Sequence, residues 1–263
     1  MNRDNLVWGV LLILAGVLFM ADSLNLIHIN VWGLIWPVAL IAFGLSVLWG
    51  YYNDPKDALV ESLAVPLEAT QEAVLAIAFG AGQLTLRAGA AAGNLLDATL
   101  GGGAESAIQR TGSRTSVTLK RKWALENMTN WQKEANDWQI RVAKNIPLSL
   151  KLEGGASQTD ADLRDLQVRD LKVGTGASQT HITLPASAGA TTAHFETGMA
   201  QVTITVPSGV AARIKVSSGL AEIDVDQSRF PKNGDIYESP GYTTAVNRVD
   251  MHIETGLGSV RVG

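Results

Sequence analysis

Apolar and polar residues alternate strictly along much of the second half of the chain. The apolar residues stand five and three positions before a glycine, as Leu171 and Val173 do before Gly176, and a polar residue, Lys172, stands between them. The same arrangement precedes four other glycines: Gly155, Gly198, Gly219 and Gly256. Alternation with a period of two predicts strands that bury one face and expose the other.

The glycines belong to an internal repeat. The five residues 155–159, Gly-Ala-Ser-Gln-Thr, recur at 176–180, and the glycines from Gly155 to Gly219 lie 21, 22 and 21 residues apart. A fixed period of this length is typical of stacked repeats, in which each unit buries its apolar row only against its neighbours. We therefore expect an all-β, solenoid-like fold of short stacked strands with about 21 residues per rung.

Each unit is expected to turn sharply at its glycine. Thr or Ser precedes most of these glycines, and glycine supplies the positive φ that many tight turns require. Pro185 and Pro207 mark a second corner, because proline cannot donate to a ladder and lies at strand ends. The last interval lengthens to 37 residues through residues 226–247, whose prolines and glycines predict a surface loop or hairpin.

The first fifty residues follow a different pattern. Residues 31–52 carry no charge and as a helix would span about 33 Å, enough to cross a bilayer. Residues 6–20 are also uncharged and predict a first, uncleaved helix, although a stretch of that length could alone serve as a signal peptide. The expected organisation is a transmembrane α-hairpin (1–52), a linker (53–73), whose later part could already belong to the next domain, and a β-repeat domain (74–263).

Charge near the helices sets the expected topology. Arg3 precedes the first helix, Lys56 follows the second, and the loop 22–30 between them has no Lys or Arg. The positive-inside rule therefore places both ends, and with them the β domain, in the cytoplasm. The lipid bilayer is then the first partner of the chain.

Composition narrows the function classes. The chain is 46% hydrophobic and 17% charged, it has no cysteine, and its net charge is −4. The absence of cysteine excludes disulfides and thiolate metal sites, and no basic patch favours nucleic acid. We find no nucleophile elbow, no phosphate-binding loop and no complete dinucleotide fingerprint, so we expect neither an enzyme nor a cofactor.

Two sets of side chains suggest a metal site or a catalytic site. His194 and His252 share one register and could be metal ligands, but a whole rung, with Lys215 in the intervening place, separates them. Rungs with Gly174 and Ser217 in that place likewise separate the carboxylates of Glu153, Glu196 and Glu254, which would otherwise suggest a β-helical carbohydrate enzyme. We therefore expect no metal site and ordinary ladder pairing of these charges.

Two segments resemble known families. The helix with Trp8 and Gly16 and the run that begins at Trp36-Pro37 resemble the transmembrane region of LiaI and LiaF type proteins of bacterial envelope-stress systems. Residues 74–263, with their Gly-Ala-Ser-Gln repeats, resemble the β domain of LiaF-like proteins and of the adhesin-like toastrack group. LiaF itself is expected to have more spans than the two visible here.

The resemblance implies a non-enzymatic protein of the bacterial cytoplasmic membrane. It would sense or regulate the envelope-stress response through protein contacts, for example with a histidine kinase-type protein. A self-assembling, adhesin-like structural protein is the alternative, and a carbohydrate-active β-helical enzyme is a further one.

Overall fold

The computed structural model describes residues 60–122 and 137–263, together with Ile41. The chain divides into two compact units, Met1–Pro55 and Lys56–Gly263. No helix within the described residues is long and apolar enough to cross a membrane, and both segments expected to do so, apart from Ile41, lie outside these residues. The Trp36-Pro37 pair and the predicted hairpin also lie outside them.

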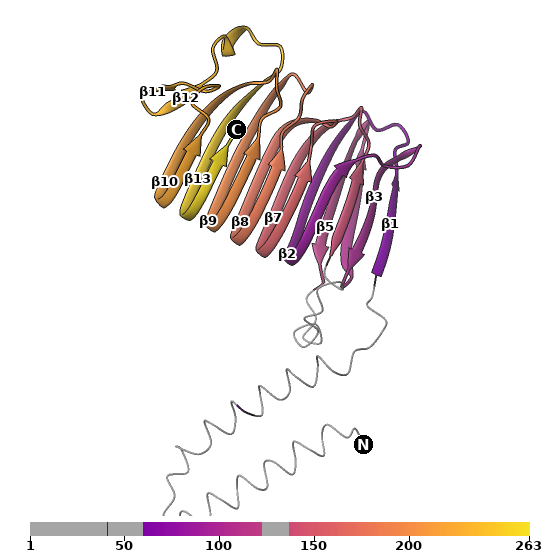
Figure 1. The fold of residues 1–263 in the computed structure, drawn as a ribbon. Helices are drawn as coiled ribbons and strands as arrows, with labels where there is room; N and C mark the ends of the chain where they lie inside the picture. Colours follow the sequence, from indigo (N-terminus) through magenta and orange to yellow (C-terminus); the bar gives the residue numbers. More distant parts are fainter. Residues whose placement is uncertain (1–40, 42–59, 123–136) are drawn as a thin grey trace, which may run out of the picture. The chain divides into compact units, whose positions relative to one another are not determined.

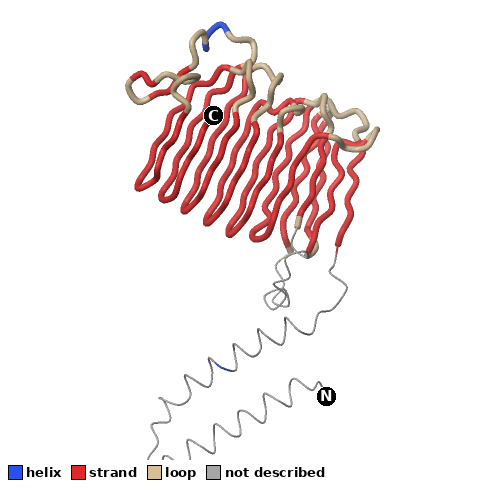
Figure 2. Tube along the Cα trace, viewed as in Figure 1, coloured by secondary structure: helices blue, strands red, loops and turns tan. Residues whose placement is uncertain are grey.

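The second unit is built from long strands that fold over at their middle (Figure 2). Each of these strands, which we call a rung, has a first arm, a bend and a second arm, and it is hydrogen-bonded along both arms to its neighbours. The rungs are β2 (Glu72–Ala88), β7 (Pro147–Asp162), β8 (Gln167–Thr183), β9 (Ala190–Thr205), β10 (Ala211–Val225) and β13 (Arg248–Val262). The all-β repeat fold expected from the sequence is confirmed, but each unit is one bent strand and not two strands joined by a turn.

All rungs pair in parallel, in the order β2-β7-β8-β9-β13-β10. The last strand of the chain, β13, therefore lies between β9 and β10, and β10 ends the stack (Figure 1). Register is in phase along the stack, since Leu171 pairs with Ala193 and Ala193 with Met251. The expectation that rungs stack in sequence order is thus wrong at β13.

Shorter strands complete the other end of the stack. The first arm of β2 pairs with β5 (Arg114–Arg121), which pairs with β4 (Ala104–Thr111). These two strands and the first arms of all the rungs form one layer, which we call sheet I. The second arm of β2 pairs with β6 (Trp138–Val142), followed by β3 (Asn94–Gly101) and β1 (Val60–Pro66), and these strands together with the second arms of all the rungs form sheet II. The stretch 53–73, expected to link the domains, therefore contains β1 and the start of β2.

One continuous core lies between the arms. Phe195 and Ile214 are fully buried, as the alternation predicts, whereas the side chain of Lys215 in the same rung is exposed. Trp138 is also fully buried, and its indole N–H donates to the carbonyl of Gly101 at 3.0 Å. Burying each large apolar side chain contributes about 1.5–3 kcal/mol, so the stack gains most of its stability from these inward rows.

The insertion after β10 forms a partial end cap. It contains β11 (Lys232–Asn233), β12 (Ile236–Glu238) and a 3-10 turn (Tyr242–Thr244). β12 pairs antiparallel with Arg213–Lys215 of β10, and Arg213 donates to Glu238 at 2.6 Å. The guanidinium of Arg213 also lies 4.3 Å from the centroid of the Tyr242 ring, so the cap is fixed to the first arm of the end rung.

Candidate functional site

The repeat glycines form the column of bends, which we call the corner. A Cβ added at Gly176 would lie 3.1 Å from the carbonyl oxygen of Gly155, and one added at Gly256 would lie 2.8 Å from that of Gly198. None of the five repeat glycines has a positive φ. The expectation that they supply a left-handed turn is wrong, because their role is to let the backbones of successive rungs approach closely.

Threonines line the inside of the corner. Thr175, Thr197 and Thr255 are buried at matching positions of three adjacent rungs. Thr175 accepts a hydrogen bond from Ser178 at 2.8 Å, whereas the hydroxyls of Thr197 and Thr255 have no partner among the described residues. A buried hydroxyl without a hydrogen bond lowers stability, so successive rungs of this column differ in energy.

The outer face of sheet I carries a pair of histidines beside the corner. Because β13 lies next to β9, His194 and His252 are direct neighbours, with ring centroids 5.3 Å apart and planes inclined by 9°. Their Nε2 atoms lie 2.8 Å and 2.9 Å from carboxylate oxygens of Glu196 and Glu254, respectively. Lys215 lies beyond His252, not between the two rings as the sequence order suggested.

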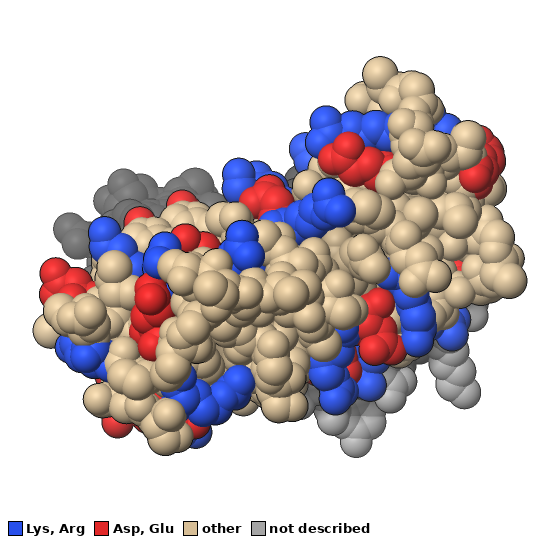
Figure 3. All heavy atoms as spheres, turned by 90° about the horizontal axis from the view of Figure 1, so that it is seen from above, with Lys and Arg blue, Asp and Glu red and all other residues tan. Residues whose placement is uncertain are grey.

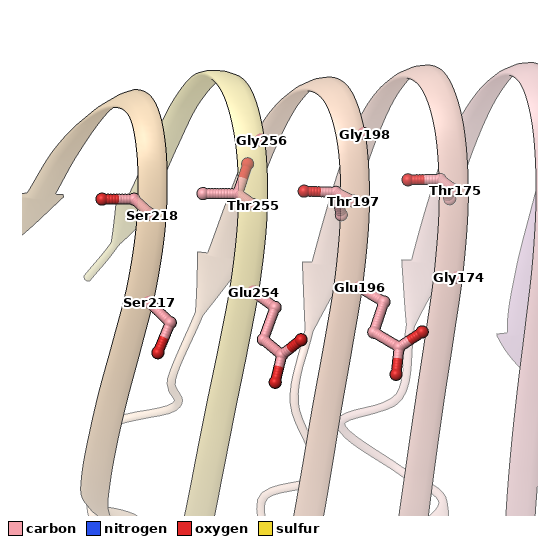
Figure 4. Close-up of a pocket in the computed structure, with 10 residues that line it drawn as sticks. All are labelled: Gly174, Thr175, Glu196, Thr197, Gly198, Ser217, Ser218, Glu254, Thr255 and Gly256. Carbon is pink, nitrogen blue, oxygen red and sulfur yellow. The ribbon is translucent and has the colours of Figure 1, made fainter.

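The same order brings two glutamates together. Glu196 pairs in register with Glu254, while Gly174 separates them from Glu153 as expected, and Ser217 lies on the far side. Figure 4 shows both carboxylates projecting in the same direction from neighbouring strands, with the threonines turned the other way. Because small residues lie on either side, a shallow groove of about 700 Å³ runs here, lined by Gly174, Thr175, Glu196, Thr197, Gly198, Ser217, Ser218, Glu254, Thr255 and Gly256.

The groove is open to solvent and polar. The side chains of Glu196 and Glu254 are 66% and 52% exposed, and each already pairs with its own histidine. A glycosidase needs a desolvated carboxylic acid and a second carboxylate on the other side of the substrate, but here both carboxylates leave one face of one sheet. Within the described ranges, no three His, Asp or Glu side chains meet as metal ligands. The arrangement therefore favours a binding surface over a reaction centre.

A second candidate surface is the end rung, β10. Strand β12 of the cap pairs only with Arg213–Lys215, and no described strand pairs with the outer edge of Val216–Val225. Val216 and Ile223 are half-buried there, although the residues beside them in β13, Ile253 and Val260, are fully buried. Part of the core row is thus uncovered at this end.

Large apolar side chains are exposed at the corner near the same end. Met199, Leu257 and Leu220 occupy matching positions in β9, β13 and β10, and they are 62%, 42% and 83% exposed. The matching positions in β7 and β8 are alanines. We call the three residues the corner ridge. The alternation of the sequence did not reveal this surface, because it depends on which rung ends the stack.

The connecting loops, at the end of the rungs opposite the corner, carry charges of both signs. Seen from that side, Lys and Arg side chains intermingle with Asp and Glu, without a large area of one sign (Figure 3). Several ion pairs are local, such as Arg164 with Asp162 at 2.6 Å and Lys144 with Asp165 at 2.9 Å. This face therefore has no strong charge preference of its own.

Two segments of the chain match known protein families. Residues 54–205 match the family model described as the N-terminal domain of toast_rack, DUF2154, and residues 6–48 match the LiaI-LiaF-like transmembrane region. No curated protein matches the sequence significantly.

Two solved structures are similar. The chain shares 20% identity with a proposed cell adhesion protein from Clostridium sporogenes, at a TM-score of 0.69, over 78% of this chain and 99% of that one. It shares 8% identity with a proposed adhesin from Bacteroides fragilis, at a TM-score of 0.31, over 79% of this chain and 98% of that one. The first likeness shows a common fold.

Proposed function

Since the chain belongs to the toast_rack N-terminal domain family and begins with a LiaI-LiaF-like transmembrane region, we propose that it is a membrane-anchored regulator of the bacterial envelope-stress response. In this proposal the rungs hold a binding surface on a membrane-anchored chain, and the protein acts by contacting other proteins rather than by catalysis. A histidine kinase-type protein is the kind of partner that such a response requires. In the same proposal both termini and the β unit lie in the cytoplasm, as the charges near the two predicted helices suggest.

One observation carries the proposal: the free edge and uncovered core row of β10. Unpaired edge strands readily accept another strand, and proteins usually cover or charge them when no partner binds there. Here a cap covers the first arm of the end rung and leaves the remainder open. Such an arrangement suits a docking surface.

Self-assembly into an adhesin-like stack is the second candidate. It is supported by free edges at both ends of the stack, since β1 also has a strand on one side only among the described residues. A heterologous contact between the two ends would produce filaments if its rotation did not close into a ring. The carbohydrate enzyme is the weakest candidate, because the groove glutamates are exposed and lie on one face.

The experiment is capture of partners from the native membrane. The intact protein is crosslinked in cells with and without a cell-wall antibiotic and then purified through an affinity tag. Recovery of a histidine kinase or of a small membrane protein in an antibiotic-dependent manner supports the regulator. Recovery of the protein alone, as a ladder of higher oligomers, would favour the structural role, and turnover of a bound glycan would contradict both.

A further inference from the structure

The end rung is capped over only part of its length. Ser239 and Glu238 hold the cap to Ala212 and Arg213 on the first arm, through the 2.8 Å bond of the Ser239 N–H to the Ala212 carbonyl and the 2.6 Å Arg213–Glu238 pair. At the distal end of the second arm, Asp226 begins a loop that returns the buried Phe230 to the core. Between them, residues 216–225 have no strand on their outer side within the described part of the chain.

We propose that this free edge of β10 binds an extended segment of another protein in which apolar residues alternate with lysine or arginine. The inference rests on the proposed role in protein contacts and specifies the chemistry of the partner. The segment would add to sheet II as one further strand, next to Leu220–Val225. It would also cover the corner ridge at its β10 end.

The apolar half of this pattern follows from the uncovered core. Along the second arm, Ile223 faces inward but is only half-buried, because no rung follows it. Its neighbour in β13, Val260, is fully buried by the rungs on either side. A strand whose inward residues are apolar would bury Ile223 to the same extent, and Leu220, which is 83% exposed, would gain a neighbour.

The basic half follows from the outward residues of the same arm. Glu222 and Asp224 both point to solvent. Asp224 is held at 3.0 Å by Arg261 of β13, but Glu222 makes no ion pair among the described residues. Opposite charges directly across a strand pair stabilise it, whereas like charges destabilise it, so the outward residues of the incoming strand should be basic.

Neither end of sheet II matches that pattern. A second β10 laid antiparallel on the first would bring Glu222 and Asp224 close to their own copies. β1, the other end of sheet II, exposes Val60, Ser62 and Ala64, none of which is charged. Charge complementarity therefore favours a different protein over a second copy.

The test uses the full chain in nanodiscs of uncharged lipid and measures peptide binding by fluorescence anisotropy. The probe is an octapeptide of alternating valine and lysine. A second peptide with glutamate in place of lysine tests charge, and a third with the valines and lysines in separate blocks tests alternation. Empty nanodiscs measure adsorption to lipid. We expect the alternating lysine peptide to bind at least tenfold more tightly than either of the other two.

Two variants locate the site. E222K should weaken the lysine peptide about tenfold and strengthen the glutamate peptide, and E105K on the distant edge strand β4 is the matched control that should leave both unchanged. A221P should also weaken binding. The Asp226 N–H donates to Val262 of β13, and successive N–H groups along a strand point to opposite edges, so the Ala221 N–H points to the free edge. Proline at position 221 therefore removes a donor that the incoming strand would use and breaks no hydrogen bond to β13. Circular dichroism checks that each variant is folded.

Equal affinity for the lysine and glutamate peptides, or no response to E222K in a folded protein, would overturn the inference. So would self-association of the full chain that E222K alters, because the occupant would then be a second copy. Failure of this inference can be distinguished from failure of the proposed function. If crosslinking still recovers an antibiotic-dependent partner while the peptide preference is absent, the regulator stands and only the docking site is wrong.

Discussion

Replacing Thr197 by valine should stabilise the protein, although the substitution removes a polar group from a regular repeat. Thr197 is 8% exposed, and its hydroxyl has no hydrogen-bond partner among the described residues. Leaving a hydroxyl buried and unbonded costs about 1–3 kcal/mol, and valine keeps the branched shape while placing a methyl group against the core. Part of the gain is lost to imperfect packing of the larger methyl, so we expect T197V to raise the free energy of unfolding by about 1 kcal/mol.

Thr175 provides a matched control in the neighbouring rung. It pairs in register with Thr197, is also 8% exposed, and accepts a hydrogen bond from Ser178 at 2.8 Å. T175V removes that bond, and such a bond contributes about 0.5–1.5 kcal/mol. The two variants should therefore move stability in opposite directions, with a difference of about 2 kcal/mol. T255V, at the third position, should behave like T197V because its hydroxyl is also unpartnered among the described residues.

The assay is thermal unfolding of the full chain in detergent, followed by the circular dichroism of its β structure. For a unit of this size, about 1 kcal/mol corresponds to a change in Tm of about 2–4 °C. T197V should therefore unfold a few degrees above the wild type and T175V a few degrees below it. If both variants lower Tm by the same amount, the hydroxyl of Thr197 has a partner or the corner cannot accept a methyl group, and the reasoning fails.

Three further predictions follow from the same rungs. F195A should lower the stability of the β unit by about 3–5 kcal/mol because it opens a cavity between arms, whereas K215A on the outer face should change it little; equal losses in urea unfolding would contradict the assigned inward row. G256A should lower the free energy of unfolding by about 1–3 kcal/mol, since its Cβ would lie 2.8 Å from a backbone carbonyl oxygen, whereas G174A, whose Cβ would meet nothing within 4 Å, should leave it unchanged or raise it slightly. Unchanged stability of G256A would refute the close-approach role of this glycine. The hydrogen bond from Arg164 holds the pKa of Asp162 below its usual value, so the carboxylate should stabilise the fold at pH values above its unfolded pKa, near 4, and lose that effect as pH falls through the lower, folded pKa. The stability difference between wild type and D162N should therefore be constant above about pH 5 and shrink as the solution is acidified below about pH 4, and a difference that grows in acid would contradict it.

The inward and outward rows could be predicted from sequence because they depend only on local alternation. Leu171, Phe195 and Ile214 are buried and Lys215 is exposed, as a period of two requires. The conformation at the glycines could not be predicted in this way. Both a left-handed turn and a close backbone approach call for glycine, and the structure distinguishes them: none of the repeat glycines has a positive φ, and a Cβ added at Gly256 would lie 2.8 Å from the carbonyl oxygen of Gly198.

The position of the last rung was the larger error, and the sequence does contain a signal for it. Residues 194–198 read His-Phe-Glu-Thr-Gly and residues 252–256 read His-Ile-Glu-Thr-Gly, whereas residues 215–219 of the rung between them in sequence read Lys-Val-Ser-Ser-Gly. Rungs that stack side by side pack the same rows against each other, so likeness in register is evidence of spatial contact. The 37-residue interval before Gly256 supplies the chain length to pass over β10 and return beside β9. Because β13 takes that inner place, the histidine and glutamate pairs form between β9 and β13, one rung before the end of the stack. β10, with Glu222 and Asp224 facing outward, is left to form the edge.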